Sequence, residues 1–376
     1  MFIHNYKIKY ILIIFLIILF YNIENYLSEK ILDEQIKERI YKKVAIIAYP
    51  NDNNIGNQLL KYAMHIILKK LGFNSTLISL KLKWKNVPNI QFLQKYVKIK
   101  EINNYYTDIK ETDFDFLIVN SDQVWAYNFE YLFEIGFLSF AKNWNIKKII
   151  YGVSIGYDHW ITKKGKLKSL KELIKHFSGI SVREEDSIDI INKSLGIKPQ
   201  FVLDPTLLLD KTDYLEIIEN YQSDIDRNQN YLCSYILDKS LNITNYIQNI
   251  ADELKYNIID IDFKNGNFIE RFIFSINICK SIITDSFHGT LFSIIFNKPF
   301  ISFINTHRGN ARFLSLNRTF QLGGRFIYPK IFEKKEISLL LESPKINMTY
   351  FKILRTKSLN FLKNNLGIMD HLVNKI

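Results

Sequence analysis

The sequence predicts an α/β protein of two domains, each a mostly parallel sheet with helices on its faces, behind an apolar N-terminal segment. Short runs rich in Ile and Val alternate with stretches of helical periodicity from residue 43 onward, and this alternation favours parallel sheets covered by helices. A polar stretch interrupts the alternation, and the pattern then restarts. With 376 residues, 47% of them hydrophobic, the chain is long and apolar enough for two cores.

The N-terminal domain is expected over residues 43–212. Its helical periodicity is clearest over Gln58–Leu71, where apolar residues recur on one face and Gly72 is a natural stop. Its strands are expected where β-branched residues cluster between turn residues. These runs are Val44–Ala48, Phe116–Val119, Ile149–Val153, Gly179–Val182 and Phe201–Leu203.

A second, smaller α/β domain is expected over residues 229–345, followed by a closing helix within residues 346–376. The polar stretch DKTDYLEIIENYQSDIDRNQN, residues 210–230, is the best candidate for the linker before it. Strands are predicted at Tyr231–Ile236, Asn257–Ile261 and Ser281–Thr284. Helices are predicted at Ile243–Leu254, Thr290–Phe296, Ile337–Leu341 and Tyr350–Leu366.

Residues 1–42 form a separate apolar segment and linker. The uncharged run YILIIFLIILFY, residues 10–21, would make a helix of roughly 20 Å, shorter than the ~30 Å hydrocarbon core of a bilayer. No small-x-small cleavage site follows it, so an anchor in the membrane surface is preferred over a signal peptide. Lysine and arginine are more frequent after the run than before it, which would keep the main body cytoplasmic, at the inner face of the membrane. An extension from an upstream start codon is the alternative.

The formal charge of +12 indicates an anionic small substrate or an anionic membrane surface. Nucleic acid is not expected as a partner, because the lysines are scattered instead of forming a stripe. The two cysteines, Cys233 and Cys279, lie far apart in apolar surroundings, and we expect them to be free core thiols in a reducing compartment. No His or carboxylate cluster has ligand spacing, so no metal site is predicted and metal use stays open. No cofactor is predicted either.

Polar side chains follow nearly every predicted strand. Because ligands of open α/β sheets bind outside the carboxyl ends of the strands, these clusters should converge on one edge of each sheet. A cleft between the domains follows if the two edges face each other. The clusters are Asn53, Gly56 and Asn57; Asn120, Ser121, Asp122 and Gln123; Ser154 and Gly156; Arg183 and Glu184; Asp204, Pro205 and Thr206; and Asp285, Ser286 and His288.

The stretch SIITDSFHGTLFSIIFNKPFISF, residues 281–303, gives the sharpest of these signals. It predicts a strand, a polar turn, a helix and a further strand. His288 stands at the expected start of the helix, and Gly289 allows a ligand to approach the backbone closely. Helix-end amides beside an imidazole form an anion site suited to phosphate.

Structural explanations remain open for each cluster. Asp204-Pro205-Thr206 would also fit an ordinary turn before a helix, and Ser121 and Asp122 would also fit helix caps. Arg183 beside Glu184 would fit a solvated ion cluster. A buried, satisfied side chain is the alternative for His288.

Taken in order, several segments resemble the polysaccharide pyruvyl transferase family, from about residue 44 to residue 316. They are GNQLLKYA (56–63), FDFLIVNSDQVW (114–125), YGVSIG (151–156), ISVREEDS (180–187), VLDPTLLL (202–209) and TDSFHGTLFSIIFNKPF (284–300). The family's pattern has Gly where this chain has Asn120, and the apolar front segment is not part of the resemblance. The resemblance implies two facing Rossmann-like domains in a GT-B-like arrangement, with the acceptor bound by residues 43–212 and the donor by residues 229–345.

The resemblance also implies a reaction. It moves the pyruvyl group of phosphoenolpyruvate onto a sugar of a cell-surface glycan or lipid-linked oligosaccharide, as a ketal, and releases phosphate. Such chemistry needs a general acid for the donor methylene carbon and cationic groups for its phosphate and carboxylate.

Mapped onto matching positions, the family's needs assign roles to individual residues. His288 is expected at the donor phosphate, as ligand or as acid, with Ser286 and the amides around Gly289. Arg183 is expected at the donor carboxylate or phosphate, with Arg312 and Arg308 as weaker candidates. Asp122 is expected to face the acceptor or transfer a proton. Asn57 and Asp204 are expected to shape the cleft, and Ser121 and Gln123 are the remaining substrate-binding candidates.

Two other functions fit parts of the sequence. A GT-B glycosyltransferase with a nucleotide-sugar donor would share the architecture, but no glutamate near residues 287–300 is placed to bind a ribose. A membrane-attached binding protein with a degenerate cleft is the other, and the joint presence of His288, Arg183 and Asp122 speaks against it.

Overall fold

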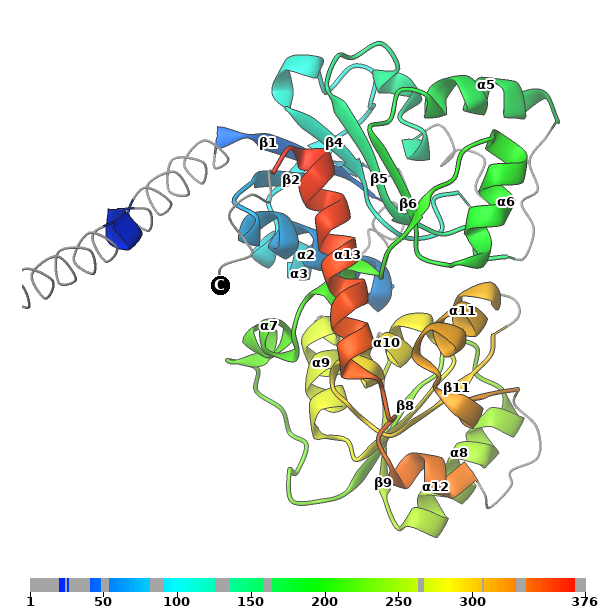
Figure 1. Cartoon of the computed structure of the whole chain (residues 1–376). Helices are drawn as coiled ribbons and strands as arrows, with labels where there is room; N and C mark the ends of the chain where they lie inside the picture. The colour runs from blue at the N-terminus through cyan, green and yellow to red at the C-terminus, as the bar shows by residue number, and fades with distance from the viewer. Residues whose placement is uncertain are drawn as a thin grey trace, which may run out of the picture.

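The protein forms two α/β domains stacked one above the other (Figure 1). The computed structural model describes residues 20–23, 26, 41–48, 54–81, 91–125, 135–157, 164–262, 267–305, 308–328 and 336–368. The apolar run expected to associate with a membrane, residues 10–21, lies almost entirely outside these ranges. No helix within them has the length and apolar character needed to cross a bilayer.

The N-terminal domain contains a parallel sheet of seven described strands in the order β3-β2-β1-β4-β5-β6-β7. Its inner strands are apolar on both faces because helices cover both sides, as the alternating pattern predicts. The strands are β1 (Lys43–Ile47), β2 (Asn74–Leu80), β3 (Ile99–Ile102), β4 (Phe116–Val119), β5 (Lys147–Val153), β6 (Gly179–Val182) and β7 (Gln200–Phe201). The helices are α2 (Ile55–Lys70), α3 (Gln91–Tyr96), α5 (Lys164–Ile174) and α6 (Asp186–Leu195).

The C-terminal domain repeats the architecture with five described strands, all parallel, in the order β12-β11-β10-β8-β9. The strands are β8 (Tyr231–Tyr235), β9 (Asn257–Asp260), β10 (Ser281–Thr284), β11 (Phe300–Phe303) and β12 (Phe326–Ile327). The helices are α8 (Leu241–Leu254), α9 (Phe268–Ile278), α10 (Phe287–Ile295), α11 (Ala311–Phe320) and α12 (Ile337–Leu341).

Two segments connect the domains. The first holds the short helices η3 (Pro205–Leu208), α7 (Lys211–Leu215) and η4 (Glu216–Ile218) and continues to β8. The second is α13 (Met348–Leu366), which begins beside the C-terminal domain and runs across the N-terminal domain (Figure 1). Its Phe351 ring lies 5.5 Å from Phe320 of α11, and its Ser358 hydroxyl accepts a hydrogen bond from the Leu203 amide at 2.9 Å.

One hydrophobic core extends through the junction between the domains. It joins side chains of α2 in one domain to side chains of α9 and α10 in the other, and α13 packs on it as well. In this core Tyr214 of α7 contacts Phe292 of α10, with the ring centroids 4.7 Å apart. Separate clusters fill the opposite faces of the two sheets. Burial of this size makes the junction a packed interface, so the site loops are held against each other.

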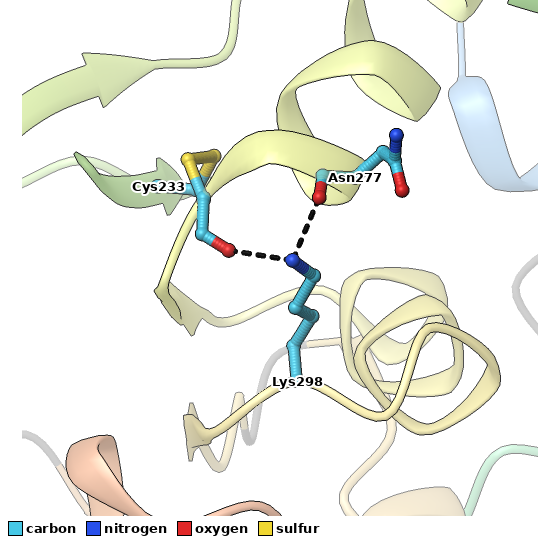
Figure 2. The surroundings of a disulfide bond; sticks show 4 residues. Cys233, Asn277 and Lys298 are labelled. Atoms are coloured by element: carbon cyan, nitrogen blue, oxygen red, sulfur yellow. Dashed lines mark hydrogen bonds between the residues drawn. A yellow bond between two sulfur atoms is a disulfide. The ribbon is translucent and has the colours of Figure 1, made fainter. Parts of the chain in front are cut away.

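The cysteines correct one prediction. Cys233 on β8 and Cys279 before β10 form a disulfide, with their Cα atoms 5.8 Å apart (Figure 2). The expectation of two free thiols is therefore wrong. Separation along the chain was misleading, because parallel pairing of β8 with β10 brings the two segments together. Beside the disulfide, Lys298 Nζ donates to the carbonyl oxygens of Asn277 at 2.7 Å and Cys279 at 2.8 Å (Figure 2).

Reduction of this disulfide should destabilise the C-terminal domain. The cross-link spans 46 residues, and the chain-entropy model assigns a loop of this length about 4 kcal/mol of the free energy of unfolding. Urea unfolding of the wild type with and without a phosphine reductant measures the difference. A Cys233→Ala/Cys279→Ala variant is the control and should not respond to the reductant. Equal wild-type midpoints in both conditions would refute the prediction.

Candidate active site

The polar loops meet at the switch points of the two sheets. Strand order reverses between β1 and β4 in the first sheet and between β8 and β10 in the second, where open α/β sheets bind their ligands. The loop after β4 carries Asp122, and the first turn of α10, which follows β10, carries His288. His288 Nε2 lies 3.8 Å from Asp204 Oδ2 of the other domain, so the convergence expected from the sequence is confirmed.

Three carboxylates surround the guanidinium of Arg183, at the end of β6. Nη1 donates to Asp204 Oδ2 at 2.7 Å and Nη2 donates to Asp122 Oδ1 at 3.1 Å. Nε donates to Glu184 Oε1 at 3.3 Å. Arg183 is 6% exposed and Glu184 1% exposed, which excludes the alternative of a solvated ion cluster. We call these four residues the Arg183 cluster.

The pKa values of the Arg183 cluster are shifted in different directions. Burial opposes ionisation of Asp122, but Arg183, His288 and Arg312 together hold the pKa of this carboxyl below its usual range. For Glu184, burial outweighs the contact with Arg183 and raises the pKa. Burial alone would lower the pKa of Arg183, and the surrounding carboxylates reverse this and raise it. Asp122 is therefore an ionised carboxylate at neutral pH.

His288 lies in the first turn of α10, wedged against the other domain. Ser286 caps the helix, since its hydroxyl accepts a hydrogen bond from the Gly289 amide at 3.3 Å. On the opposite side, a Cβ placed on Gly56 of α2 would lie 1.9 Å from His288 Nδ1. Only glycine at this position lets α2 approach the imidazole so closely. His288 Nε2 is buried and has no hydrogen-bond partner among the described residues.

The buried environment sets the protonation state of His288. Burial lowers the pKa of the imidazole to about 4, against the opposing influence of Asp204. The ring is thus neutral at pH 7. A neutral ring with an unpaired buried nitrogen is one that a polar ligand group can satisfy.

Arg312, in the first turn of α11, is a second buried cation in the site. It donates to the carbonyl oxygens of Gly309 and Arg308. No carboxylate of the described residues pairs with it. Burial and the nearby Arg183 lower the pKa of Arg312 to about 10. Both guanidinium carbons lie 5.1 Å from the Phe287 ring, and both arginines line the same cavity of about 20 Å³.

Further contacts join the site loops across the junction. Gln123 Nε2 donates to the Arg308 carbonyl at 3.3 Å. A Cβ on Gly309, whose φ is +93°, would lie 2.4 Å from the Gly156 carbonyl oxygen. The loop after β4 is itself strained, since Asp122 has a φ of 109°. Such a conformation at a residue bonded to Arg183 is typical of a functional loop.

Several of the predicted site residues stabilise the local structure of the site. Asp204 Oδ1 accepts from the amide and hydroxyl of Thr206 at 3.0 and 2.7 Å, so its turn role coexists with its bond to Arg183. Ser121 donates to the Gly152 carbonyl at 2.6 Å. Asn120 is buried and donates to the Leu60 carbonyl at 3.2 Å. Asn57 is buried in the first turn of α2.

The sequence did not single out Gly56 as the neighbour of His288, or Phe287 as the ring between the two arginines. Their positions inside the motifs GNQLL and SFHG were the available signal.

Gly289 packs close to Thr284, because its Cβ would lie 2.3 Å from Thr284 Oγ1. Within the described residues, no group of three His, Cys, Asp or Glu side chains is placed to hold a metal ion.

The contact between Gly56 and His288 can be tested directly. A Gly56→Ala variant should lower the free energy of unfolding by about 1–3 kcal/mol through overpacking, although alanine favours the helix by about 1 kcal/mol. Chemical denaturation measures this loss. Gly324→Ala is the matched control, because nothing lies within 4 Å of a Cβ at Gly324. Equal stability of the two variants would contradict the contact.

His288 should also make stability depend on pH. Its folded pKa of about 4 lies below its unfolded value near 6.5, so the unfolded chain binds the proton more readily between these values. The free energy of unfolding should therefore fall as pH decreases from 6.5 to 4. The shifted pKa of His288 should account for a loss on the order of 2 kcal/mol at pH 5. Urea unfolding of the wild type and His288→Gln at pH 7.5 and 5 measures this share.

His65 provides the control for this titration. Burial lowers the pKa of His65 to about 4 as well, so His65→Gln should remove a similar share of the pH dependence without touching the site. A His288 imidazole signal that titrates near pH 6.5 by NMR would contradict the buried neutral state.

Comparisons with known proteins agree with the geometry. Three solved structures share the fold: MnaA of S. aureus with UDP (TM-score 0.52, 11% identity, 87% of this chain and 98% of that chain), UDP-GlcNAc 2-epimerase of Methanocaldococcus jannaschii (0.52, 15%, 84% and 99%) and UGT89C1 of Arabidopsis thaliana with UDP-L-rhamnose (0.51, 10%, 88% and 98%). At these identities the likeness shows the GT-B-like fold alone. No curated protein matches the chain.

The family comparison is more specific than the fold. The model of the polysaccharide pyruvyl transferase family matches residues 54–307. This range begins one residue before α2, so it covers the loop after β4, the Arg183 cluster and His288. Since it also spans more than half of the chain, the protein belongs to the polysaccharide pyruvyl transferase family and is a transferase.

Proposed function

We propose that the protein transfers the pyruvyl group of phosphoenolpyruvate onto a sugar of a cell-surface glycan, as a ketal, with release of phosphate. The observation that carries the proposal is a pair of buried, incompletely paired groups between the domains. There, the buried guanidinium of Arg312 lacks a carboxylate partner among the described residues, beside the unpaired Nε2 of His288. Membership of the family supports this donor over other phosphorylated compounds.

The reaction forms two C–O bonds at one carbon, the first by addition to the enol and the second by substitution of phosphate. One sugar hydroxyl adds to the substituted carbon of the enol, and a proton adds to the methylene carbon, which becomes a methyl group. A second hydroxyl of the sugar then displaces phosphate at the same carbon, and its proton leaves with the phosphate. No redox step or resident cofactor is needed, and we propose that none is used.

Arg183 and Arg312 are suited to different roles, because their hydrogen-bond partners differ. Arg183 already has three carboxylate partners, so an incoming anion would compete with Asp204 and Asp122 for its donors. Among the described residues Arg312 donates hydrogen bonds only to carbonyl oxygens, and its pKa is lowered to about 10. A donor phosphate or carboxylate would restore the favourable environment that burial removes from Arg312. We therefore assign Arg312 to the donor and Arg183 to the ordering of the carboxylates.

His288 is suited to move a proton once the donor is bound. In the free site its pKa is about 4 and the ring is neutral. A dianionic phosphate beside Nε2 would raise that pKa, because opposite charge favours the imidazolium. Donor binding would thus be coupled to uptake of a proton, which His288 would deliver to the departing phosphate or to the methylene carbon.

Asp122 is assigned to the acceptor side. Its side chain is 18% exposed, against 1–2% for the other carboxylates of the Arg183 cluster. Because it is ionised at neutral pH, it would accept a hydrogen bond or a proton from a sugar hydroxyl, and it would not act as the acid. Gln123 contacts the Arg308 carbonyl across the junction between the domains and, together with Asn57, would orient the sugar.

Phosphate release by the full chain tests the proposed reaction. With phosphoenolpyruvate and bacterial surface oligosaccharides, we expect one phosphate per pyruvyl group gained by the glycan, measured by mass spectrometry. His288→Gln should reduce turnover by at least 100-fold. Absence of release with every acceptor, together with tight binding of a nucleotide sugar, would favour a GT-B glycosyltransferase instead.

A matched pair of arginines separates donor binding from general charge. Arg312→Lys should raise the KM for phosphoenolpyruvate by roughly 10–100-fold, because lysine does not reproduce the fork of donors. Arg308→Lys is the control, since Arg308 is half-exposed and already paired with Asp238 at 2.7 Å. Equal effects of the two substitutions would contradict the assignment of Arg312. Arg183→Ala is not informative, because it would leave buried carboxylates unpaired and destabilise the fold.

A further inference from the structure

A second cavity, of about 650 Å³, opens at the junction of the two domains away from the Arg183 cluster. Its walls come from α3 of the N-terminal domain, from the segment around η4, and from the start of α9 in the C-terminal domain. These elements lie on the same side of the molecule as α7 (Figure 1). The volume is in the range of small-molecule sites, which prefer domain interfaces. We call it the junction pocket.

The lining of the junction pocket combines aromatic rings with amides and carboxylates. Tyr96 and Tyr221 are half-buried in its wall, each packed on another aromatic ring, with centroids 5.1 Å from Phe92 and 5.5 Å from Phe274 respectively. Around them stand the polar side chains of Asn220, Gln222, Asn267, Glu216 and Glu270. Rigid rings with polar groups at their rim are suited to a ligand that has both C–H faces and hydroxyl groups.

These polar groups are available to a ligand. None of the side chains of Asn220, Gln222, Asn267 and Glu270 makes a hydrogen bond to another described residue. Asn267 precedes α9, yet its side chain makes no capping bond. The Tyr221 hydroxyl likewise has no partner within the described ranges. Amides both donate and accept, and carboxylates accept from hydroxyl groups, which is the donor and acceptor set that sugar hydroxyls require.

The charge of the lining selects among sugars. Glu216 and Glu270 outnumber the single cation, Lys95, whose ammonium lies over the Tyr96 ring at 4.9 Å from its centroid. An anionic sugar would be repelled by the two carboxylates. The pocket therefore favours uncharged hexoses, with or without N-acetyl groups.

The pocket shares the helix α2 with the proposed reaction centre. Its wall residues Phe92 and Tyr96 pack on Tyr62 of α2, with ring centroids 5.6 and 5.7 Å away. Tyr62 stands six residues after Gly56, the neighbour of His288, which corresponds to about 9 Å along the helix. Tyr62 is itself buried, so a glycan that reached both sites would run over the surface of the junction.

We infer that the junction pocket is a binding site for an uncharged oligosaccharide, the part of the acceptor beyond the unit that is modified. The connection of this pocket to the reaction rests on the proposed function, whereas the choice of a neutral glycan rests on the lining residues. The protein would then recognise an acceptor longer than one sugar, and both domains would contact it.

Direct binding tests the inference without the donor. The probes are the β-1,4-linked trisaccharides of N-acetylglucosamine and of galactose, with trigalacturonic acid as the anionic comparison, added to the full chain and followed by calorimetry or saturation-transfer NMR. At least one neutral trisaccharide should bind, and trigalacturonic acid should bind at least 10-fold more weakly. Failure of both neutral probes to bind, or equal binding of the anionic one, would overturn the inference.

Variants locate the binding in the pocket. Tyr221→Ala and Asn267→Ala should each weaken binding of the neutral trisaccharide by about 5–10-fold. Asn267 makes no capping bond, so its variant should retain the stability of the wild type. Tyr350→Ala is the control, since Tyr350 is an exposed tyrosine on α13 outside the pocket. Unchanged binding in both pocket variants would place the glycan elsewhere.

The same data separate this inference from the proposed reaction. If the neutral trisaccharide binds in the pocket but no phosphate is released from phosphoenolpyruvate, the pocket stands and the donor assignment fails. If phosphate is released but the pocket variants have unchanged KM for a long acceptor and unchanged trisaccharide binding, the reaction stands and the pocket inference fails.

Discussion

The buried guanidinium of Arg183 is the interaction on which the rest of the site depends. A charge removed from water at this depth is tolerated only when it is paired and hydrogen-bonded. Arg183 meets this condition with carboxylates from three different segments, so the ends of β4, β6 and β7 are tied to one point. Loops that would otherwise move independently then share a common geometry, including the strained Asp122.

The two domains contribute different groups to this centre. The N-terminal domain supplies the carboxylates of the Arg183 cluster, and the C-terminal domain supplies His288 and Arg312. Each of these two groups has incomplete pairing among the described residues, whereas Arg183 is fully engaged. The fully paired groups therefore lie in the N-terminal domain and the incompletely paired groups in the C-terminal domain. An entering anion would find its hydrogen-bond donors on the C-terminal domain.

Much of the fold follows from sequence pattern alone. The strands β4, β6 and β10 occur at the predicted residues, because buried β-branched runs between turn residues have few other solutions. The strands β2 and β3 were missed, since NSTLISL and IKEI carry polar residues that weaken the signal. The polar clusters met as expected, because parallel strands align their carboxyl ends. Which arginine is paired, and which cysteine bonds which, depends on contacts between distant segments that no local pattern contains.

The helix α13 restricts how the two domains can move. The chain crosses the junction first through the η3 to β8 segment and again on the way into α13, whose Arg355 is bonded to the Leu208 carbonyl and to Asp210 beside that first crossing. Two crossings that are bonded to each other would resist twisting of one domain against the other. Any opening of the site loops would then follow a single direction, and Gly56 would return to the same face of His288 when the loops close.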